Sequence, residues 1–239
     1  MPRLSIVVPV YTEARRLAPA MQKLAVVLET FPFSHEVLLI VEKSGDASLA
    51  IAREVISAHP NWRAIDNQVH CGKGYAVRSG VAHAAPDAAF ICFMDADLSS
   101  DPVAITDALA LLENEPSVAI VAGDRRHPQS IVRRDQGKSR PFFSRLFNFT
   151  VRVFFPFIKT RDTQCGFKLF RAGAARAIFE KARIDGFAFD VEIFKLAHRL
   201  GYEVRGIPVR WTDAPHSTVR ALRHGAQMFR DLLRLRFWR

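Results

Sequence analysis

The sequence has few cysteines, and their spacing excludes a disulfide framework. Cys71, Cys92 and Cys165 are the only three among 239 residues, and no two of them form a CxxC pair. Scattered thiols of this kind are typical of a protein that stays in a reducing compartment. We expect no signal peptide before the first apolar segment, and the sequence has no uncharged apolar run of about 18 residues, the length that spans a bilayer. We therefore expect a cytosolic protein or one that lies on a membrane face.

Internal repeats, low-complexity linkers and nucleic-acid-binding motifs are missing as well. Because no linker interrupts them, the 239 residues are predicted to form one α/β domain with a C-terminal extension. A hydrophobic content of 49% indicates a folded chain. Acidic residues are outnumbered, since 34 lysines and arginines against 24 aspartates and glutamates give a net charge of +10. This excess predicts an anionic membrane surface or a phosphorylated small molecule as partner, and no nucleic acid.

Two aspartates one residue apart follow a short apolar run. Residues 90–94 (FICFM) are too few for a helix and predict a strand buried on both faces. Asp95 and Asp97 come directly after it, where open α/β sheets bind ligands. Paired carboxylates suit Mg²⁺ or Mn²⁺, which take further oxygen ligands from phosphates. The alternative is an Asp-rich turn that caps the helix beginning near Pro102.

Strand and helix patterns alternate through the first half of the chain. We expect strands at 4–10, 36–41, 63–65, 89–94 and 118–122, with amphipathic helices between them. This alternation predicts a mostly parallel sheet built from βαβ units. Because the carboxyl ends of parallel strands share one edge, the polar residues that follow them are expected to converge there. They are Tyr11, Glu13, Glu42, Asp46, Asp95, Asp97 and Arg125.

Two glycines flank a lysine at the start of an expected helix, at residues 72–74. Glycines before a helix let a phosphate approach exposed N–H groups, and a lysine adds positive charge. The spacing fits neither a Walker A loop nor GxGxxG, because Tyr75 and Val77 occupy positions that those motifs reserve for other residues. A plain tight turn therefore competes with a phosphate-binding loop.

The second half is basic and rich in phenylalanine. Residues 127–140 predict a polar loop, and residues 141–157 hold seven phenylalanines and two arginines. That segment is either a core helix or an amphipathic helix in a membrane interface. One helix is expected up to about residue 181, and residues 186–192 start another that ends at Gly201. Residues 202–211 alternate like a strand with one solvent-facing side. The tail predicts a helix with one apolar face, formed by Leu222, Ala226, Phe229 and Leu233.

Five motifs in this order resemble the family 2 inverting glycosyltransferases of the GT-A fold. They are VPVYTE at 8–13, GKGYAVRSG at 72–80, FMDADLS at 93–99, DTQCGFKLF at 162–170 and GFAFDVE at 186–192. The fourth motif is the most specific and resembles the dolichyl-phosphate glucosyltransferase branch. The resemblance implies a Rossmann-like, mostly parallel sheet flanked by helices, with a C-terminal amphipathic extension. It further implies a nucleotide-sugar-binding half at 1–125 and an acceptor-binding half at 126–239.

The resemblance also implies roles for individual residues. The residues implied to contact the nucleotide sugar are Pro9, Tyr11, Glu13, Glu42, Lys73, Asp95, Ala96 and Arg125. Asp95 and Asp97 are the implied ligands of Mg²⁺ or Mn²⁺, and Asp97, Asp162 and Asp190 are the implied catalytic residues. The residues implied to bind the phosphate of the acceptor substrate are Arg133, Arg134, Arg145 and Arg220. For Asp162 and Asp190, a turn or N-cap role explains the residue equally well.

Two positions depart from the family pattern. The family usually has VDDGS after the second strand, where an aspartate reads the base, whereas this chain has VEKSGD at 41–46. Glu42 can still accept a hydrogen bond, but Lys43 places a positive charge where the family has the second aspartate. The identity of the base in the donor nucleotide therefore stays open. Residues 215–218 (PHST) stand where relatives often carry Gly-Ser-Lys, and Arg220 is available as a substitute.

The implied activity is the metal-dependent transfer of a hexose, with inversion, from a nucleotide sugar to a polyprenyl or dolichyl phosphate. UDP-glucose is the favoured donor and GDP-mannose the second choice. The implied location is peripheral, on an anionic cytoplasmic membrane face, while the oligomeric state stays open. Two alternatives remain: a soluble glycosyltransferase with a non-lipid acceptor, and a degenerate, non-catalytic nucleotide-binding module. Intact Asp95 and Asp97 argue against the second.

Overall fold

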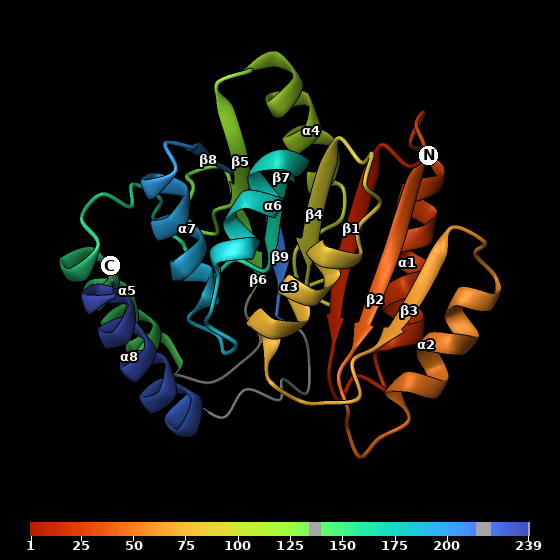
Figure 1. Cartoon of the computed structure of the whole chain (residues 1–239), viewed down its shortest axis with the longest axis horizontal. Helices are drawn as coiled ribbons and strands as arrows, with labels where there is room; N and C mark the ends of the chain where they lie inside the picture. The colour runs from red at the N-terminus through yellow and green to blue at the C-terminus, as the bar shows by residue number, and fades with distance from the viewer. Residues whose placement is uncertain (134–139, 214–220, 239) are drawn as a thin grey trace.

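The computed structural model of the chain describes residues 1–133, 140–213 and 221–238 (Figure 1). A seven-stranded sheet lies between two layers of helices. Its strands are β1 (Leu4–Val10), β2 (His35–Val41), β3 (Trp62–Asp66), β4 (Phe90–Met94), β5 (Val118–Gly123), β7 (Phe167–Arg171) and β8 (Glu203–Ile207). A second sheet pairs β6 (Ile131–Arg133) with β9 (Arg210–Thr212). The helices are α1 (Leu17–Glu29), α2 (Ser48–Ser57), α3 (Lys73–His83), α4 (Ala104–Asn114), α5 (Arg140–Phe154), α6 (Ala172–Lys181), α7 (Phe189–Arg199) and α8 (Ala221–Phe237).

The strand order of the large sheet is β3-β2-β1-β4-β7-β5-β8. The pairs β1–β2, β2–β3, β1–β4 and β5–β8 are parallel, and β7 runs antiparallel to both of its neighbours. The chain leaves β1 toward β2 and β3, then returns to the other side of β1 with β4. Such a reversal opens a crevice at the carboxyl ends of the strands, where α/β proteins bind ligands. The mostly parallel sheet expected from the sequence is confirmed.

The sheet is covered on both faces, as its apolar strands predict. Strands β1, β2, β4 and β5 bury almost every residue. Helices α1, α2 and α4 form one hydrophobic cluster with the sheet, and α3, α6 and α7 form the other. The predicted inward face of α1 is confirmed, because Leu17, Met21, Leu24 and Leu28 are all buried.

Strand β7 is absent from the expectations, and it decides the layout of the site. It holds a lysine within an apolar stretch, and residues 162–170 gave no alternating pattern that would predict a strand. Because β7 is antiparallel, Phe167 pairs with Met94 at the carboxyl end of β4. The loop before β7 therefore reaches the same edge of the sheet as the loops that follow the parallel strands.

The prediction of a single strand at 202–211 with one solvent-facing side is wrong in part, because the segment forms two strands, β8 and β9. Pro208 separates β8 from β9, because a proline cannot donate the hydrogen bond that a continuous strand needs. The two pieces belong to different sheets, and Trp211 of β9 forms a bridge with Ser100, just beyond the pair of aspartates. The predicted helix end at Gly201 is confirmed by its positive φ of 75°.

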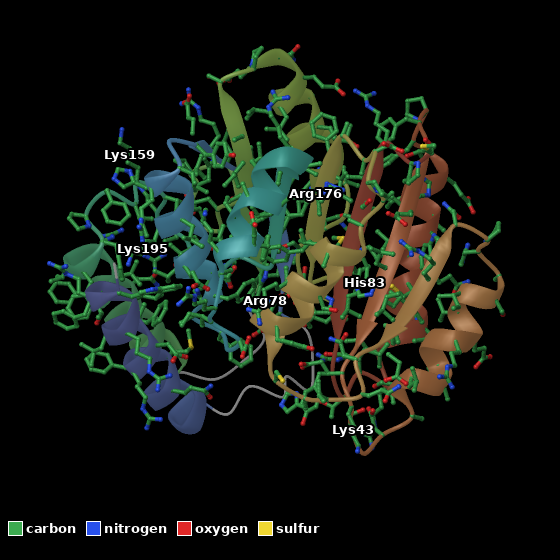
Figure 2. The ribbon with its side chains drawn as sticks, viewed as in Figure 1. Lys43, Arg78, His83, Lys159, Arg176 and Lys195 are labelled. Carbon is green, nitrogen blue, oxygen red and sulfur yellow. The ribbon has the colours of Figure 1, made fainter. Side chains whose placement is uncertain are left out.

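Helices α5 and α8 pack together at one end of the molecule, beyond α7 (Figure 1). The buried face of α8 carries Leu232 and Leu235. Figure 2 shows Lys195 between α7 and α8, where its Nζ donates to the carbonyl of Trp238 at 2.6 Å. Two residues of the apolar face expected from the sequence, Phe229 and Leu233, do not make this contact, because they are exposed. The side chains of Leu222 and Ala226 lie outside the described residues. Among the described residues, no helix combines the length and the apolar character that crossing a membrane requires.

Candidate active site

Polar loops meet at the carboxyl edge of the sheet, and the backbone is strained there. Thr12, Gln68 and Leu98 adopt left-handed backbone angles, with φ near +50° (52°, 52° and 48°). They follow β1, β3 and β4 respectively. Left-handed conformations cost a non-glycine residue free energy and tend to cluster at functional sites. The strain therefore marks the same edge that the loop positions indicate.

Asp95 lies directly against the backbone of Gly166. The N–H of Asp95 donates to the carbonyl of Gly166 at 3.0 Å. A β-carbon on residue 166 would stand 1.9 Å from Oδ2 of Asp95, far inside any permitted contact. Gly166 thus leaves the space that the carboxylate occupies, and this explains why a glycine precedes β7.

Lys73 holds the other oxygen of Asp95. Its Nζ lies 2.6 Å from Oδ1 of Asp95. Burial alone would lower the pKa of Lys73, and the nearby carboxylates of Asp95 and Asp190 raise it above the usual value. The lysine therefore stays charged and fixes the direction of the carboxylate.

The glycines on either side of Lys73 serve a contact within the chain. β-carbons at Gly72 and Gly74 would stand 2.6 Å and 2.2 Å from the carbonyl oxygens of Asp185 and Ile184. The N–H of Gly74 donates to the Asp185 carbonyl at 2.7 Å. Arg78 of α3 reinforces this contact, with Nη2 2.5 Å from Oδ1 of Asp185 (Figure 2). Because this N–H is already used, the turn interpretation describes the loop better than a phosphate cradle does.

Asp97 faces the loop that follows β1. Its Oδ1 accepts the N–H of Ser99 at 2.9 Å, and its Oδ2 lies 3.7 Å from Nη1 of Arg16. Arg16 also binds Glu13 with two hydrogen bonds, at 2.8 and 2.7 Å. Burial and the neighbouring Asp95 raise the pKa of Asp97, and burial raises the pKa of Glu13 to about 7 against the opposing effect of Arg16. A cationic ligand or a metal ion beside Asp97 would favour the charged carboxylate and so oppose this rise in its pKa.

Asp190 is paired with a lysine that is completely buried. Nζ of Lys168 lies 2.5 Å from Oδ1 of Asp190 and donates to the carbonyl of Cys165 at 3.0 Å. The ammonium groups of Lys168 and Lys73 lie 5.0 and 6.0 Å from the ring centre of Phe93. Burial raises the pKa of Asp190, although both lysines oppose the shift. Positive and negative groups thus alternate from Lys168 through Asp190 and Lys73 to Asp95.

Asp162 is engaged by Arg125. Nε and Nη2 of the arginine lie 2.6 and 2.8 Å from the two carboxylate oxygens. The Arg125 N–H adds a third hydrogen bond at 3.1 Å, and the guanidinium lies over the ring of Trp211. Burial alone would raise the pKa of Asp162, but Arg125 holds it below the usual value. Both expected catalytic carboxylates outside the Asp95–Asp97 turn are therefore held in ion pairs.

Glu42 lies beneath the loop that leads into α3. Its Oε1 accepts the N–H groups of Cys71 and Gly72, each at 2.9 Å, and its Oε2 lies 2.9 Å from Nδ1 of His70. The ring of His70 stacks on Tyr11 with centroids 3.8 Å apart and an interplanar angle of 7°. A cavity of about 360 Å³ opens beside Glu42, at the carboxyl ends of β2 and β3. It is lined by Val41, Glu42, Lys43, Ser44, Asp46, Leu49, Asp66 and Gln68.

The remaining predicted residues fall into two groups. Pro9 pairs with Ile40 inside the sheet, and Ala96 is buried in the core between the two aspartates. Arg133 is exposed at the end of β6. The predictions for Arg134 and Arg220, and for the side chain of Arg145, lie outside the described residues.

Four residues around these pairs escaped the sequence analysis. Lys168 sits in an apolar stretch, where a lysine is rare unless it is paired, and that rarity was its signal. Arg16 lies three residues after Glu13, a spacing that allows a side-chain pair on one helical turn. Gly166 stood within a recognised motif without a stated role. His70 gave no signal, because only the fold brings it to Glu42 and Tyr11.

The donor set fits a divalent metal ion that shares its coordination with a phosphorylated ligand. No group of three or more histidine, cysteine or acidic side chains is arranged to hold a metal within the described residues. Asp95 and Asp97 supply hard carboxylate oxygens at the carboxyl edge of the sheet, and both side chains remain partly accessible. Mg²⁺ and Mn²⁺ are commonly bound by one or two carboxylates, with phosphate oxygens and water completing the shell.

Sequence comparisons identify the family. The model described as "Glycosyl transferase family 2" matches residues 5–179. A dolichyl-phosphate beta-glucosyltransferase from Dictyostelium discoideum is 31% identical, over 98% of this chain and 74% of that protein. The protein of the same name from Drosophila melanogaster is 33% identical, over 96% of this chain and 73% of that protein. The resemblance that the motifs indicated is thereby confirmed.

Solved structures share the fold at low sequence identity. Mannosyl-3-phosphoglycerate synthase from Rubrobacter xylanophilus superposes with a TM-score of 0.72 at 16% identity, over 98% of this chain and 74% of that one. Glucosyl-3-phosphoglycerate synthase from Mycobacterium tuberculosis, in complex with Mn²⁺, UDP-glucose and phosphoglyceric acid, gives 0.72 at 13% identity, over 98% and 79%. The mostly parallel sheet between two layers of helices agrees with these comparisons. The chain therefore belongs to glycosyl transferase family 2 and is a hexosyltransferase of the GT-A fold.

Proposed function

We propose that this enzyme transfers glucose from UDP-glucose to a polyprenyl or dolichyl phosphate and forms a β-linked glycosyl phosphate. The relatives named dolichyl-phosphate beta-glucosyltransferase, which match nearly the whole chain, support this acceptor. One observation in the site supports it independently: both carboxylates outside the Asp95–Asp97 turn that were candidates for a general base, Asp162 and Asp190, are buried in ion pairs. An acceptor that is already anionic needs no such base.

A phosphate acceptor meets that condition. A phosphate monoester carries between one and two negative charges near pH 7, so its oxygen is a nucleophile without proton removal. That oxygen attacks the anomeric carbon of glucose from the face opposite to the UDP leaving group. A bond forms between the acceptor oxygen and the anomeric carbon, and the bond to the β-phosphate of UDP breaks. The electron pair of the broken bond leaves with UDP, and a single displacement inverts the configuration.

The residues of the crevice would bind the donor and stabilise the leaving group. Asp95 and Asp97 would hold Mg²⁺ or Mn²⁺, which supplies positive charge at the departing diphosphate. Lys73 would hold Asp95 in a fixed direction, because its Nζ lies 2.6 Å from that carboxylate. Arg16 and Arg125 border the edge with further positive charge, although each is already paired with a carboxylate. Preorganised charge of this kind is commonly the largest contribution to transition-state stabilisation.

The pair of helices α5 and α8 would bring the enzyme to the surface of the membrane that holds the acceptor. Five large apolar side chains on these helices are exposed: Phe149, Val153, Phe229, Leu233 and Phe237. Arginines alternate with them, and Arg230, Arg234 and Arg236 are exposed on α8. An apolar strip between basic residues fits an anionic interface. We place the enzyme peripherally, on the cytoplasmic face. A second copy of the chain is the alternative cover for this strip.

The acceptor can be tested by product extraction. The purified enzyme is incubated with radiolabelled UDP-glucose, Mg²⁺ or Mn²⁺ and polyprenyl phosphate in detergent, with GDP-mannose as a parallel donor. We expect the label in the organic phase as a glycolipid that mild acid hydrolyses. The Asp97→Ala variant is the negative control. Label found only in a water-soluble glycoside, with polyprenyl phosphate unmodified, would contradict the lipid acceptor and favour the soluble transferase.

A further inference from the structure

His70 is fixed in position from two directions. Nδ1 of its ring lies 2.9 Å from the buried carboxylate of Glu42. The face of the ring lies against Tyr11 at 3.8 Å, almost parallel to it. The hydrogen bond limits rotation of the ring within its plane, and the stack sets the plane itself. Nevertheless, 45% of the His70 side chain is exposed. A side chain this constrained at an open edge is suited to directional recognition.

The contact with Glu42 also decides which ring nitrogen carries the proton. Oε2 of an ionised carboxylate can only accept, so Nδ1 of His70 must donate. In the neutral form of the imidazole this leaves the lone pair on Nε2, as in other carboxylate–histidine pairs. No side chain or backbone group of the described residues donates to Nε2. The exposed edge of the neutral His70 ring therefore presents one oriented hydrogen-bond acceptor.

Nε2 of His70 lies within reach of a nucleotide whose diphosphate binds beside Asp95, the partner of Lys73. His70 precedes Lys73 by three residues, so their Cα atoms are at most about 11 Å apart. This span is comparable to the length of a nucleoside between its base and its phosphates. Glu42 is less suited to meet the base, because it is buried and its two oxygens already receive three donors.

We infer that His70 reads the base of the donor nucleotide, by accepting a hydrogen bond at Nε2, and that it selects uracil. Uracil presents one N–H donor, at N3, between two carbonyl oxygens, and a single acceptor matches it. Cytosine has a lone pair at N3 and would oppose the lone pair of Nε2. Guanine presents two adjacent donors, of which one would stay unpaired, and an unpaired buried donor weakens binding. The inference rests on the proposed function, in which UDP-glucose is the donor, and assigns its base recognition to His70.

The cavity beside Glu42 is the other place where a base could bind. No aromatic side chain belongs to its lining, so a base there would gain no stacking. Next to His70 a base can also contact Tyr11, whose side chain is partly exposed. The two locations make different predictions, because only the first one depends on the ring nitrogens of His70.

Isothermal titration of UDP and CDP in the presence of Mn²⁺ tests the inference. UDP and CDP have nearly the same shape, but the hydrogen-bonding pattern at N3 and C4 is reversed. We expect the wild-type enzyme to bind UDP roughly tenfold or more tightly than CDP, in keeping with the cost of an unmatched polar group. His70→Phe keeps a ring against Tyr11 but removes the acceptor, so the ratio should fall to within about twofold of one. His70→Gln keeps an acceptor oxygen and should retain part of the preference, which provides a second measurement if the Phe variant does not fold.

The matched control is His59→Phe. His59 also stacks on an aromatic ring, that of Trp62 at 4.3 Å, but it lies before β3 and thus at the opposite edge of the sheet. This variant should keep the wild-type ratio. A His70→Phe enzyme that still prefers UDP as strongly as the wild type would overturn the inference, and so would a wild type that binds UDP and CDP equally. Glucose transfer from UDP-glucose, measured in parallel, separates the outcomes. Transfer with an unchanged ratio in His70→Phe refutes only the role of His70, whereas no transfer from UDP-glucose refutes the donor itself.

Discussion

Gly166 and Asp95 are in such close contact that a β-carbon at position 166 would stand 1.9 Å from Oδ2 of the aspartate. The two residues are also joined by a hydrogen bond from the Asp95 N–H to the Gly166 carbonyl, at 3.0 Å. They come from motifs about 70 residues apart in the sequence, and the antiparallel pairing of β7 with β4 brings them together. The position of the first aspartate is therefore set by a residue of the fourth motif.

The first prediction concerns this contact. In Gly166→Ala the methyl group must displace the Asp95 carboxylate or the β7 backbone. A displacement of about 1 Å at a reacting centre can cost roughly 100-fold in rate, so we expect kcat/KM for glucose transfer to fall by about that factor. Gly173→Ala is the matched control, because nothing lies within 4 Å of a β-carbon there and alanine favours the helix. Equal activity in the two variants would show that Asp95 tolerates a shift.

The second prediction concerns the metal ion. Asp97→Ala should abolish transfer while the circular dichroism spectrum and the thermal midpoint stay close to those of the wild type. Asp95→Ala should weaken UDP binding as well, because Lys73 then loses its partner. The reason is that two carboxylates at a strand end face an anionic diphosphate and require a divalent cation between them.

Asp107→Ala makes the same change at an exposed position on α4 and should leave activity unchanged. Excess EDTA should stop the wild-type enzyme, and added Mg²⁺ or Mn²⁺ should restore it. Full turnover in excess EDTA would refute the metal requirement.

The third prediction separates structure from catalysis at Asp190. Asp190→Asn leaves Lys168 completely buried without a carboxylate, and breaking a buried pair typically costs about 3–5 kcal/mol of unfolding free energy. The double variant Asp190→Asn with Lys168→Met should recover much of that loss, because no charge is then left unpaired. Urea denaturation of the wild type, of Asp190→Asn and Lys168→Met alone, and of the double variant gives the coupling free energy. The rate per folded molecule should fall only modestly in Asp190→Asn. An Asp190→Asn enzyme that is as stable as the wild type yet inactive would instead identify Asp190 as a proton acceptor.

The fourth prediction concerns the exposed strip on α5 and α8. The wild-type enzyme should co-sediment with anionic vesicles at low salt and dissociate as salt is added, because each basic residue near the surface contributes roughly 1 kcal/mol that salt screens. Phe149→Glu and Leu233→Glu should each weaken this binding several-fold, since both side chains are exposed within the strip.

Val26→Glu is the corresponding control. Val26 is 60% exposed on α1, away from the strip, and the variant should bind vesicles like the wild type. If the wild type does not bind vesicles at low salt, the membrane proposal fails. A wild-type dimer that Leu233→Glu converts to a monomer would show that a second copy covers the strip.

The local patterns of the sequence were sufficient for most of the elements. Strands β1, β2, β4 and β5 are apolar runs buried on both faces, and such runs can be recognised without knowing their neighbours. The pattern failed at β7, because the lysine at its second position makes it resemble a surface segment. It also failed at α8, where leucines on a neighbouring face meet the body of the protein. Both failures have one cause: which polar group is paired, and which apolar face is covered, depends on segments distant in the chain.

The sequence by itself determined the family, the sheet and the position of Asp95 and Asp97 at a strand end, because short motifs and strand periodicity are local properties. Only the tertiary structure decided how the charges are used. It paired Asp162 with Arg125 and Asp190 with the buried Lys168, and so left two of the three expected catalytic carboxylates as partners of cations. It also brought Glu42 under His70, across 28 residues of sequence. Ion pairs and close contacts depend on distances of a few ångströms between segments far apart in the chain, and those distances exist only once the sheet has assembled.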